Sequence, residues 1–142
     1  MNNNTRDEKS NPADGNAQAD VTQGKSRILL AEDDGAMRRL LEVVLKRAGY
    51  EVTSAEDGLQ AMQAIGTQKF DLVVLDAIMP NLSGLELCRI FRANSNWQKI
   101  PLILMSGMEP DSNCKADIHL LKSADLQEEL LSAVSNLLAA SR

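Results

Sequence analysis

The sequence predicts an α/β protein built on a parallel β-sheet that is covered by helices on both faces. Short aliphatic runs such as "LVVL" and "LILM" have no polar side, which is typical of strands that are buried on both faces. Segments with helical spacing separate most of these runs, and this alternation favours a parallel sheet. The 142 residues suffice for one domain, and 44% of them are hydrophobic, so a core can form.

The expected elements follow one another along the chain with short connections. We predict strands at residues 27–31, 50–55, 71–75, 100–105 and 117–121. We predict helices at residues 35–49, 58–66, 84–93 and 126–138.

The first strand and first helix have clear local signals. The run "RILLA" is aliphatic and is followed directly by acids, which indicates a buried strand. The next segment, "GAMRRLLEVVLKRAG", has apolar residues at helical spacing, and Gly49 can end the helix in a left-handed turn. Asp34 stands before this helix and is expected to cap it.

The middle elements are bounded by capping residues. After the strand "YEVTSA", Asp57 is expected to cap a helix whose apolar face carries Ala61, Met62 and Ile65. The strand "DLVVL" follows. Ser83 and Glu86 then have the spacing of a capping box and are expected to open the third helix.

The last elements include an unusual connection. "IPLILM" and "DIHLL" read as the fourth and fifth strands, but only "GMEPDSNCKA" separates them. A parallel crossover normally carries a helix, so we expect a fourth helix to be shortened or absent. Asp125 and Glu128 have capping-box spacing before the final apolar helix.

The chain divides into a polar N-terminal segment and one folded domain. Residues 1–26 are mainly Asn, Asp, Ser, Gly and Gln and have little to bury, so we expect a disordered tail. Residues 27–142 form the expected domain.

Composition and charge exclude several classes of function. The net charge of −5 argues against a surface built to bind nucleic acid. No apolar run is long enough to span a membrane, and no signal-peptide core is present, which favours a cytoplasmic protein. Cys88 and Cys114 match no metal-binding spacing, and both thiols are expected to be reduced.

Polar residues that could bind a ligand or react follow four of the five strands. Glu32, Asp33 and Asp34 follow the first strand, and Asp76 follows the third. Two more residues stand in the same position on the last two strands: Ser106 and Lys122. Because the carboxyl ends of parallel strands meet at one edge of the sheet, these side chains should lie at one rim, where α/β proteins bind ligands.

The residue types at this rim favour a phosphoryl group held with Mg²⁺. Clustered carboxylates repel one another, and a hard divalent cation with oxygen ligands removes that conflict. Lys122 adds a mobile positive charge, and Ser106 adds a hydroxyl donor. Asp76 would then act as the nucleophile in aspartyl-phosphate chemistry.

The chain resembles the receiver domains of two-component response regulators over residues 27 to about 140. The resemblance is carried by "ILLAEDD", "DLVVLDAIMPNLSGLEL", "IPLILMSG" and Lys122, in this order. It implies a doubly wound, flavodoxin-like sheet with strand order 2-1-3-4-5. It also implies a signalling module rather than an enzyme, which takes a phosphoryl group from a histidine kinase or histidine phosphotransfer protein. With no output domain expected after Leu138, the signal would pass by contact with a downstream protein or by onward transfer of the phosphoryl group.

The resemblance also implies a role for each rim residue. Asp76 would be the phosphoacceptor and a metal ligand, and Asp33 the main metal ligand. Glu32 would act on the Mg²⁺ through water. The remaining roles fall to the backbone carbonyl of Ile78 in the metal shell, the hydroxyl of Ser106 near the phosphoryl group, and Lys122 on a phosphoryl oxygen.

Three positions depart from the family pattern. Ser123 stands where Pro usually follows the lysine, so the Lys122–Ser123 peptide bond is expected to be trans and Lys122 slightly displaced. His119 stands at a switch position usually held by Tyr or Phe, and the fourth helix is shortened or lost.

Two alternative functions stay open. A haloacid-dehalogenase-type phosphatase also uses an Asp nucleophile with Mg²⁺, but its second acid would fall at Ile78, which argues against it. A receiver-like scaffold that functions without phosphorylation is the other alternative.

Overall fold

The computed structural model describes residues 24–108 and 115–141, and it has strands alternating with helices as the sequence predicts. The strands are β2 (Arg27–Ala31), β3 (Glu51–Ala55), β4 (Leu72–Asp76), β5 (Leu102–Ser106) and β6 (Ile118–Leu121). The helices are α3 (Gly35–Arg47), α4 (Gly58–Thr67), α5 (Gly84–Ala93) and α6 (Leu126–Ala140).

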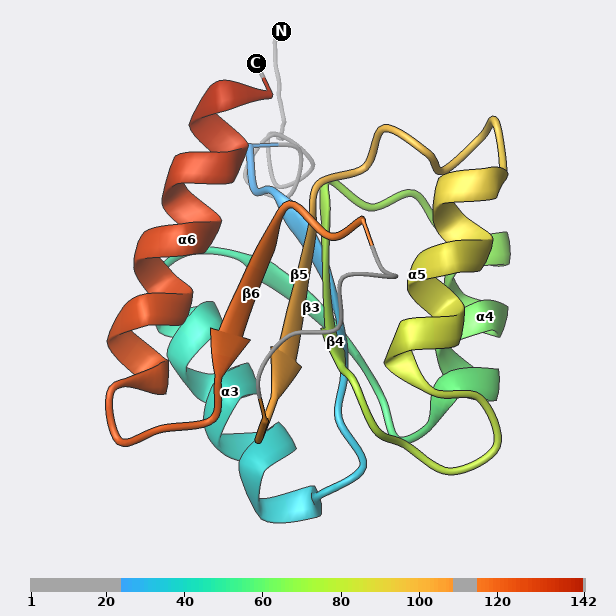
Figure 1. Cartoon of the computed structure of the whole chain (residues 1–142). Helices are drawn as coiled ribbons and strands as arrows, with labels where there is room; N and C mark the ends of the chain where they lie inside the picture. The colour runs from blue at the N-terminus through green and yellow to red at the C-terminus, as the bar shows by residue number, and fades with distance from the viewer. Residues whose placement is uncertain (1–23, 109–114, 142) are drawn as a thin grey trace, which may run out of the picture.

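The strands form one parallel sheet in the order β3-β2-β4-β5-β6 (Figure 1). In chain order this is 2-1-3-4-5, so the doubly wound fold class is confirmed. The order reverses beside β2, and the carboxyl ends of β2 and β4 are therefore neighbours. A ligand site is expected at this reversal.

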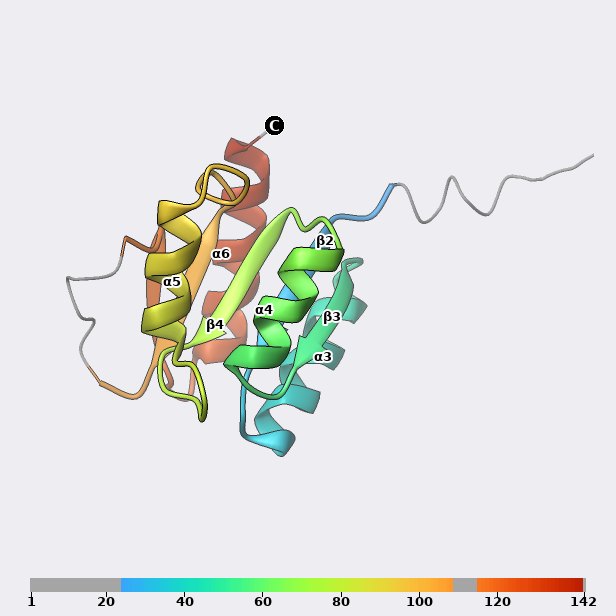
Figure 2. The same ribbon diagram turned by 90° about the vertical axis from the view of Figure 1, so that its right-hand side faces the viewer.

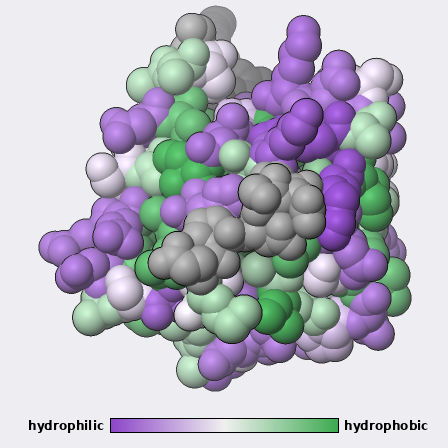
Figure 3. Space-filling model, viewed as in Figure 1, coloured by the Kyte–Doolittle hydropathy of each residue, from purple (hydrophilic) through white to green (hydrophobic). Residues whose placement is uncertain are grey.

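The core consists of two apolar layers, one on each face of the sheet. Alternate residues of a strand point to opposite faces, so Leu29 and Val73 pack under α4 and α5, whereas Ile28 and Val74 pack under α3 and α6. Figures 1 and 2 show these helix pairs on the two faces of the sheet. Hydrophilic side chains cover most of the face seen in Figure 3, with apolar patches between them.

Three of the four predicted helix caps are confirmed. The side chains of Asp34 and Asp57 accept hydrogen bonds from backbone N–H groups of α3 and α4, and Ser83 forms a capping box with Glu86 at α5. The prediction for α6 is wrong, because Asp125 has a ψ of 8° and its side chain makes no capping hydrogen bond. Gly49 has a φ of 102°, as the left-handed turn after α3 requires.

The connection from β5 to β6 has no helix among its described residues. Residues 107–108 and 115–116 are not helical, and residues 109–114 lie outside the described part of the chain. The four described helices agree with the prediction that the fourth of the usual five is shortened or absent.

Arg92, near the end of α5, ties this connection to the rest of the fold. Its guanidinium donates to the backbone carbonyls of Gln98, Ile100 and Lys115 and forms an ion pair with Asp117 at 2.8 Å. The same Asp117 carboxylate oxygen accepts from the backbone N–H of Leu102, so one side chain links the starts of β5 and β6.

Two other expectations concern the tail and the cysteines. The predicted tail falls almost entirely on residues 1–23, outside the described residues. The expectation of a reduced thiol is wrong for Cys88, which is fully buried in α5 and disulfide-bonded. Cys114 lies outside the described residues. None of the described helices is long and apolar enough to cross a membrane.

Candidate functional site

The sheet brings the predicted acids together at the carboxyl ends of β2 and β4. Glu32 and Asp33 follow the last residue of β2, and Asp76 is the last residue of β4. One carboxylate oxygen from each of these three residues lies within 4.8 Å of the others. Glu32 is fully buried and Asp76 is 5% exposed, whereas Asp33 is exposed to solvent.

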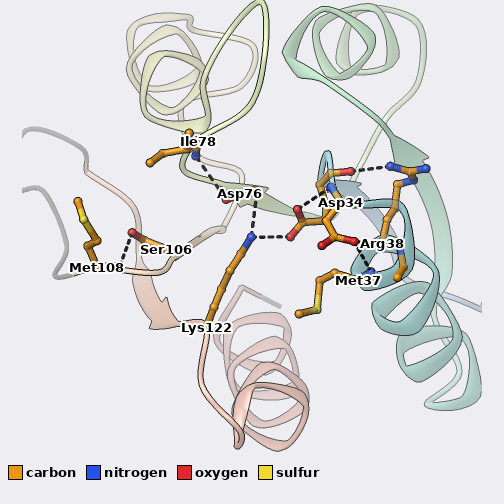
Figure 4. A network of polar contacts seen from close by, with 10 residues as sticks. Asp34, Met37, Arg38, Asp76, Ile78, Ser106, Met108 and Lys122 are labelled. Atoms are coloured by element: carbon orange, nitrogen blue, oxygen red, sulfur yellow. Dashed lines mark hydrogen bonds and ion pairs between the residues drawn. The ribbon is translucent and has the colours of Figure 1, made fainter.

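Lys122 reaches this acidic cluster from the end of β6. Its Nζ atom lies 2.8 Å from Oε1 of Glu32 and 2.9 Å from Oδ2 of Asp76 (Figure 4). The Lys122–Ser123 peptide bond is trans, as expected, because the described residues contain no cis bond. The ammonium nevertheless contacts both buried acids, so a trans bond is compatible with Lys122 in the site.

The electrostatics of the site follow from burial and from this ion pairing. Burial raises the pKa of the Asp76 carboxyl, and the neighbouring Glu32 raises it further, although Lys122 opposes the shift. Burial would lower the pKa of the Lys122 ammonium, but its contacts with Glu32 and Asp76 outweigh burial and raise it. Lys122 is therefore held charged, and the pKa of Asp76 stays above its ordinary value.

Backbone groups near the cluster fix the position of its acids. The N–H of Asp34 donates to Oε2 of Glu32 at 3.1 Å, and the N–H of Ile78 donates to Oδ1 of Asp76 at 3.3 Å. The guanidinium of Arg38 donates to the carbonyl of Glu32 at 2.8 Å. These contacts leave the second oxygen of each buried acid directed toward Lys122.

Gly84 allows the loop after β4 to close tightly over the acid. A Cβ at this position would lie 2.0 Å from the backbone oxygen of Asp76, so only glycine permits the observed approach. The N–H of Gly84 donates to the carbonyl of Ala77 and holds the start of α5 against the end of β4.

Ser106 lies at the same rim but does not contact the acidic cluster. It ends β5, next to Met105, which pairs with Asp76 in the sheet. Its hydroxyl accepts from the backbone N–H of Met108, on the side of the site away from Arg38 (Figure 4). His119 lies on β6 opposite Leu104 and is half-buried.

One residue that shapes the site, Arg38, was not predicted from the sequence. Arg38 had no signal beyond its position in the first helix, and its role depends on the turn of α3 over the end of β2. Gly84 lies within the motif after Asp76, but the need for glycine comes from a backbone contact that spacing alone does not show.

The donor set fits a hard divalent cation. Three carboxylates gather at the site and one ammonium compensates them, so the four groups have an excess of two negative charges when ionised. Oxygen ligands of this kind suit Mg²⁺, which also keeps several waters. Glu32, Asp33 and Asp76 are the side chains that would hold it.

Comparisons with known proteins find relatives that cover most of the chain. A family model described as the response regulator receiver domain matches residues 28–133. The response regulator receiver protein CpdR of Brucella abortus (strain 2308) is 34% identical over 119 residues, which cover 80% of this chain and 98% of CpdR.

Other relatives are longer than this chain. The uncharacterized transcriptional regulatory protein YrkP of Bacillus subtilis (strain 168) is 45% identical over 81 residues, and the match covers 57% of this chain but only 33% of YrkP. Among solved structures, the response regulator protein TrrA of Thermotoga maritima, in complex with Mg(2+)-BeF, has a TM-score of 0.72 and 33% identity, covering 79% of this chain and 98% of TrrA.

Proposed function

The chain belongs to the response regulator receiver family, and from this premise we propose that it is an Mg²⁺-dependent phosphoacceptor that takes a phosphoryl group on Asp76. The donor would be the phosphohistidine of a histidine kinase or of a histidine phosphotransfer protein. The observation that carries the proposal is the cluster of Glu32, Asp33 and Asp76 with the Lys122 ammonium on two of its acids.

The residues of the cluster have distinct tasks in this reaction. An ionised Oδ atom of Asp76 attacks the phosphorus, an O–P bond forms, and the P–N bond to the donor imidazole breaks. Lys122 favours the ionised form of Asp76, against the upward pKa shift that burial causes, and an Mg²⁺ ion held by the cluster would favour it further. Mg²⁺ would neutralise charge on the phosphoryl oxygens, while Asp33 and Glu32 hold it.

Lys122 and Ser106 would act on the phosphoryl group after transfer. The Lys122 ammonium, already 2.9 Å from Asp76, can move to a phosphoryl oxygen while α6 and β6 keep its backbone in place. The Ser106 hydroxyl would leave the N–H of Met108 and donate to another phosphoryl oxygen. This rearrangement at the end of β5 would be the local event that changes protein contacts.

The signal would leave this module by contact with a downstream protein or by transfer of the phosphoryl group. TrrA is bound to Mg(2+)-BeF in its solved structure, which supports an Mg²⁺ site in this chain as well. The acidic net charge supports a protein partner rather than nucleic acid. We place the protein in the cytoplasm, away from membranes, where a kinase could reach it.

Labelling with acetyl phosphate and Mg²⁺, followed by intact-mass spectrometry, tests the proposal. We expect one phosphoryl adduct on the wild type and none on Asp76→Asn, which keeps the side-chain shape but removes the nucleophile. Asp125→Asn, at an exposed acid outside the site, is the control and should be labelled like the wild type. Continuous release of phosphate without an adduct would indicate a phosphatase. A wild type that is never labelled would indicate a scaffold.

A further inference from the structure

A groove of about 570 Å³ lies at the end of the sheet opposite Asp76. It is lined by the end of α4 with the loop that follows it and by the connection from α5 to β5. These segments lie toward the top of Figure 2. Ile65 and Phe70 are buried and form its floor, and Ile100 and Trp97 are half-buried at its side. The groove therefore offers apolar surface to an occupant.

Trp97 is held rigidly at the edge of this groove. Its ring packs edge-to-face on Phe91, with 5.6 Å between ring centroids and 73° between planes. Its backbone N–H donates to the carbonyl of Asn94, and its carbonyl accepts from Ile100. Within the described part of the chain, the indole N–H has no acceptor, so the side chain combines a fixed apolar face with a free donor.

The surroundings of the groove are positively charged, although the whole chain has a net charge of −5. Lys69 lines the groove and Lys99 precedes Ile100. Both are exposed, and neither ammonium has an ion-pair partner among the described residues. The Arg27 guanidinium lies 5.7 Å from the centroid of the Phe70 ring and is ion-paired with Glu51 at 3.9 Å, so the free positive charge comes from the two lysines. The nearest acid along the chain is Asp71, whose carboxylate already accepts from the backbone N–H of Arg27.

We propose that this groove docks an acidic segment of a partner protein, with an apolar side chain inserted beside Trp97 and carboxylates near Lys69 and Lys99. The apolar floor supplies affinity, and the two unpaired ammonium groups select negative charge. The site is separate from the phosphorylation site, and binding does not require a phosphoryl group.

The shape of the groove favours a peptide segment over a small molecule. Its rim residues Gly66, Thr67, Gln68 and Asn96 are exposed, so an occupant would keep one side in water. Small-molecule sites usually bury most of the ligand surface. A protein segment needs only its anchor side chain buried, with a polar rim around it.

Titration with a capped hexapeptide, Asp-Glu-Phe-Leu-Asp-Glu, tests the proposal on the full chain. Trp97 is the one tryptophan of the sequence, so its fluorescence reports directly on the groove. We expect saturable binding, and we expect amide chemical-shift changes centred on residues 65–70 and 96–100. The same peptide with lysines in place of its acids should not bind. Asp76→Asn should bind like the wild type.

Two sets of variants separate the groove from general effects of charge and folding. Lys69→Glu with Lys99→Glu should weaken binding at least tenfold. Arg39→Glu with Lys115→Glu is the control, because it changes the net charge equally at exposed positions outside the groove. Gly66→Leu should block the groove, since a Cβ there has no atom within 4 Å and the side chain can extend over the floor. Leucine also favours the helix, so the folded state should be kept.

Several outcomes would overturn the proposal. If the two charge-reversed double variants bind the peptide with equal affinity, Lys69 and Lys99 do not select an acidic segment. Unchanged binding in Gly66→Leu would place the peptide elsewhere. If Gly66→Leu alters sedimentation of the peptide-free protein, the occupant is a second copy of the chain. If Asp20→Lys with Val21→Ser shifts the peptide-free Trp97 emission, the occupant is the chain's own N-terminal segment.

Discussion

The proposed role of Asp76 places two opposing demands on its carboxylate, since a nucleophile must be ionised and a buried carboxylate is costly. The side chain is 5% exposed and lies beside the fully buried Glu32. Lys122 compensates one of the two charges, which leaves the apo site with excess repulsion. In the proposed function, this loss of stability is the cost of charges that are already in place for a cation and a phosphoryl group.

Asp76→Asn should stabilise the metal-free protein at neutral pH. Burial, and then Glu32, raise the pKa of Asp76 in the folded state. An acid with a raised folded-state pKa favours folding below its unfolded pKa of about 3.9, and that contribution is lost as the pH rises through the folded-state pKa. Above this pH window, removing the charge should therefore raise the free energy of unfolding.

The measurement is urea unfolding in EDTA between pH 4 and pH 8. The curves of the wild type and Asp76→Asn should converge near pH 4 and separate as the pH rises. Asp125→Asn should follow the wild type throughout, because Asp125 is exposed and makes no capping contact. A less stable Asp76→Asn at pH 7 would mean that the Lys122 pair outweighs the burial of Asp76.

The phosphoryl group on Asp76 should be long-lived. Ile78 and Met108 are 67% and 68% exposed, and they lie beside Asp76 and Ser106 at the open side of the site (Figure 4). Neither side chain can orient a water or accept its proton. The attacking water is therefore poorly positioned, and we expect hydrolysis to be about 10–100-fold slower than with a polar residue at these positions. The decay of the labelled protein after removal of donor should accelerate in Ile78→Asn with Met108→Glu. Equal decay rates would show that these side chains do not set the lifetime.

The site residues could be predicted because each follows an apolar strand, and parallel strands place their carboxyl ends together. Glu32, Asp33, Asp76 and Lys122 were found in this way and meet in the structure. The contact of Arg38 with the Glu32 carbonyl could not be predicted, because it depends on how α3 leaves the sheet. The role of Ile78 in a metal shell stays a prediction.

At the scale of elements, sequence patterns predicted the helix caps correctly where a cap depends only on a short segment of the chain. The caps at Asp34, Asp57 and Ser83 need only a side chain and the next turn of helix. The same spacing failed at Asp125, whose backbone is not in the extended conformation of an N-cap residue. The set of contacts by which the Arg92 guanidinium joins the segments before β5 and β6, called the Arg92 clamp below, could not be predicted either. Its partner Asp117 is 25 residues away in the sequence.

Arg92→Lys should destabilise the fold, because the clamp depends on the shape of the guanidinium. The group bonds three carbonyls and one carboxylate at once, which a single ammonium cannot reproduce. We expect a loss of about 2–4 kcal/mol in the free energy of unfolding, measured by urea titration. Arg89→Lys, at an exposed position of the same helix, should change it by less than about 0.5 kcal/mol. Equal effects at both positions would show that Arg92 is not a clamp.

At the scale of the whole molecule, the sheet separates two surfaces with different chemistry. Its carboxyl ends carry the acidic cluster, and the opposite end carries the groove beside Trp97. Helix α5 spans the distance between them, from Gly84 against Asp76 to the loop that holds Trp97. In the two proposals, one end exchanges a phosphoryl group while the other contacts a protein.

Mg²⁺ should stabilise the whole fold through the acidic cluster. A ligand that binds only the folded state stabilises it by mass action, by about 1.4 kcal/mol at ten times its dissociation constant. For a domain of this size, that corresponds to a rise in melting temperature of roughly 3–8 °C. Asp33→Asn removes the exposed acid of the cluster and should abolish most of the rise, whereas Glu129→Gln on α6 should keep it. Differential scanning calorimetry with and without millimolar Mg²⁺ measures the shift, and a full response in Asp33→Asn would place the metal outside this cluster.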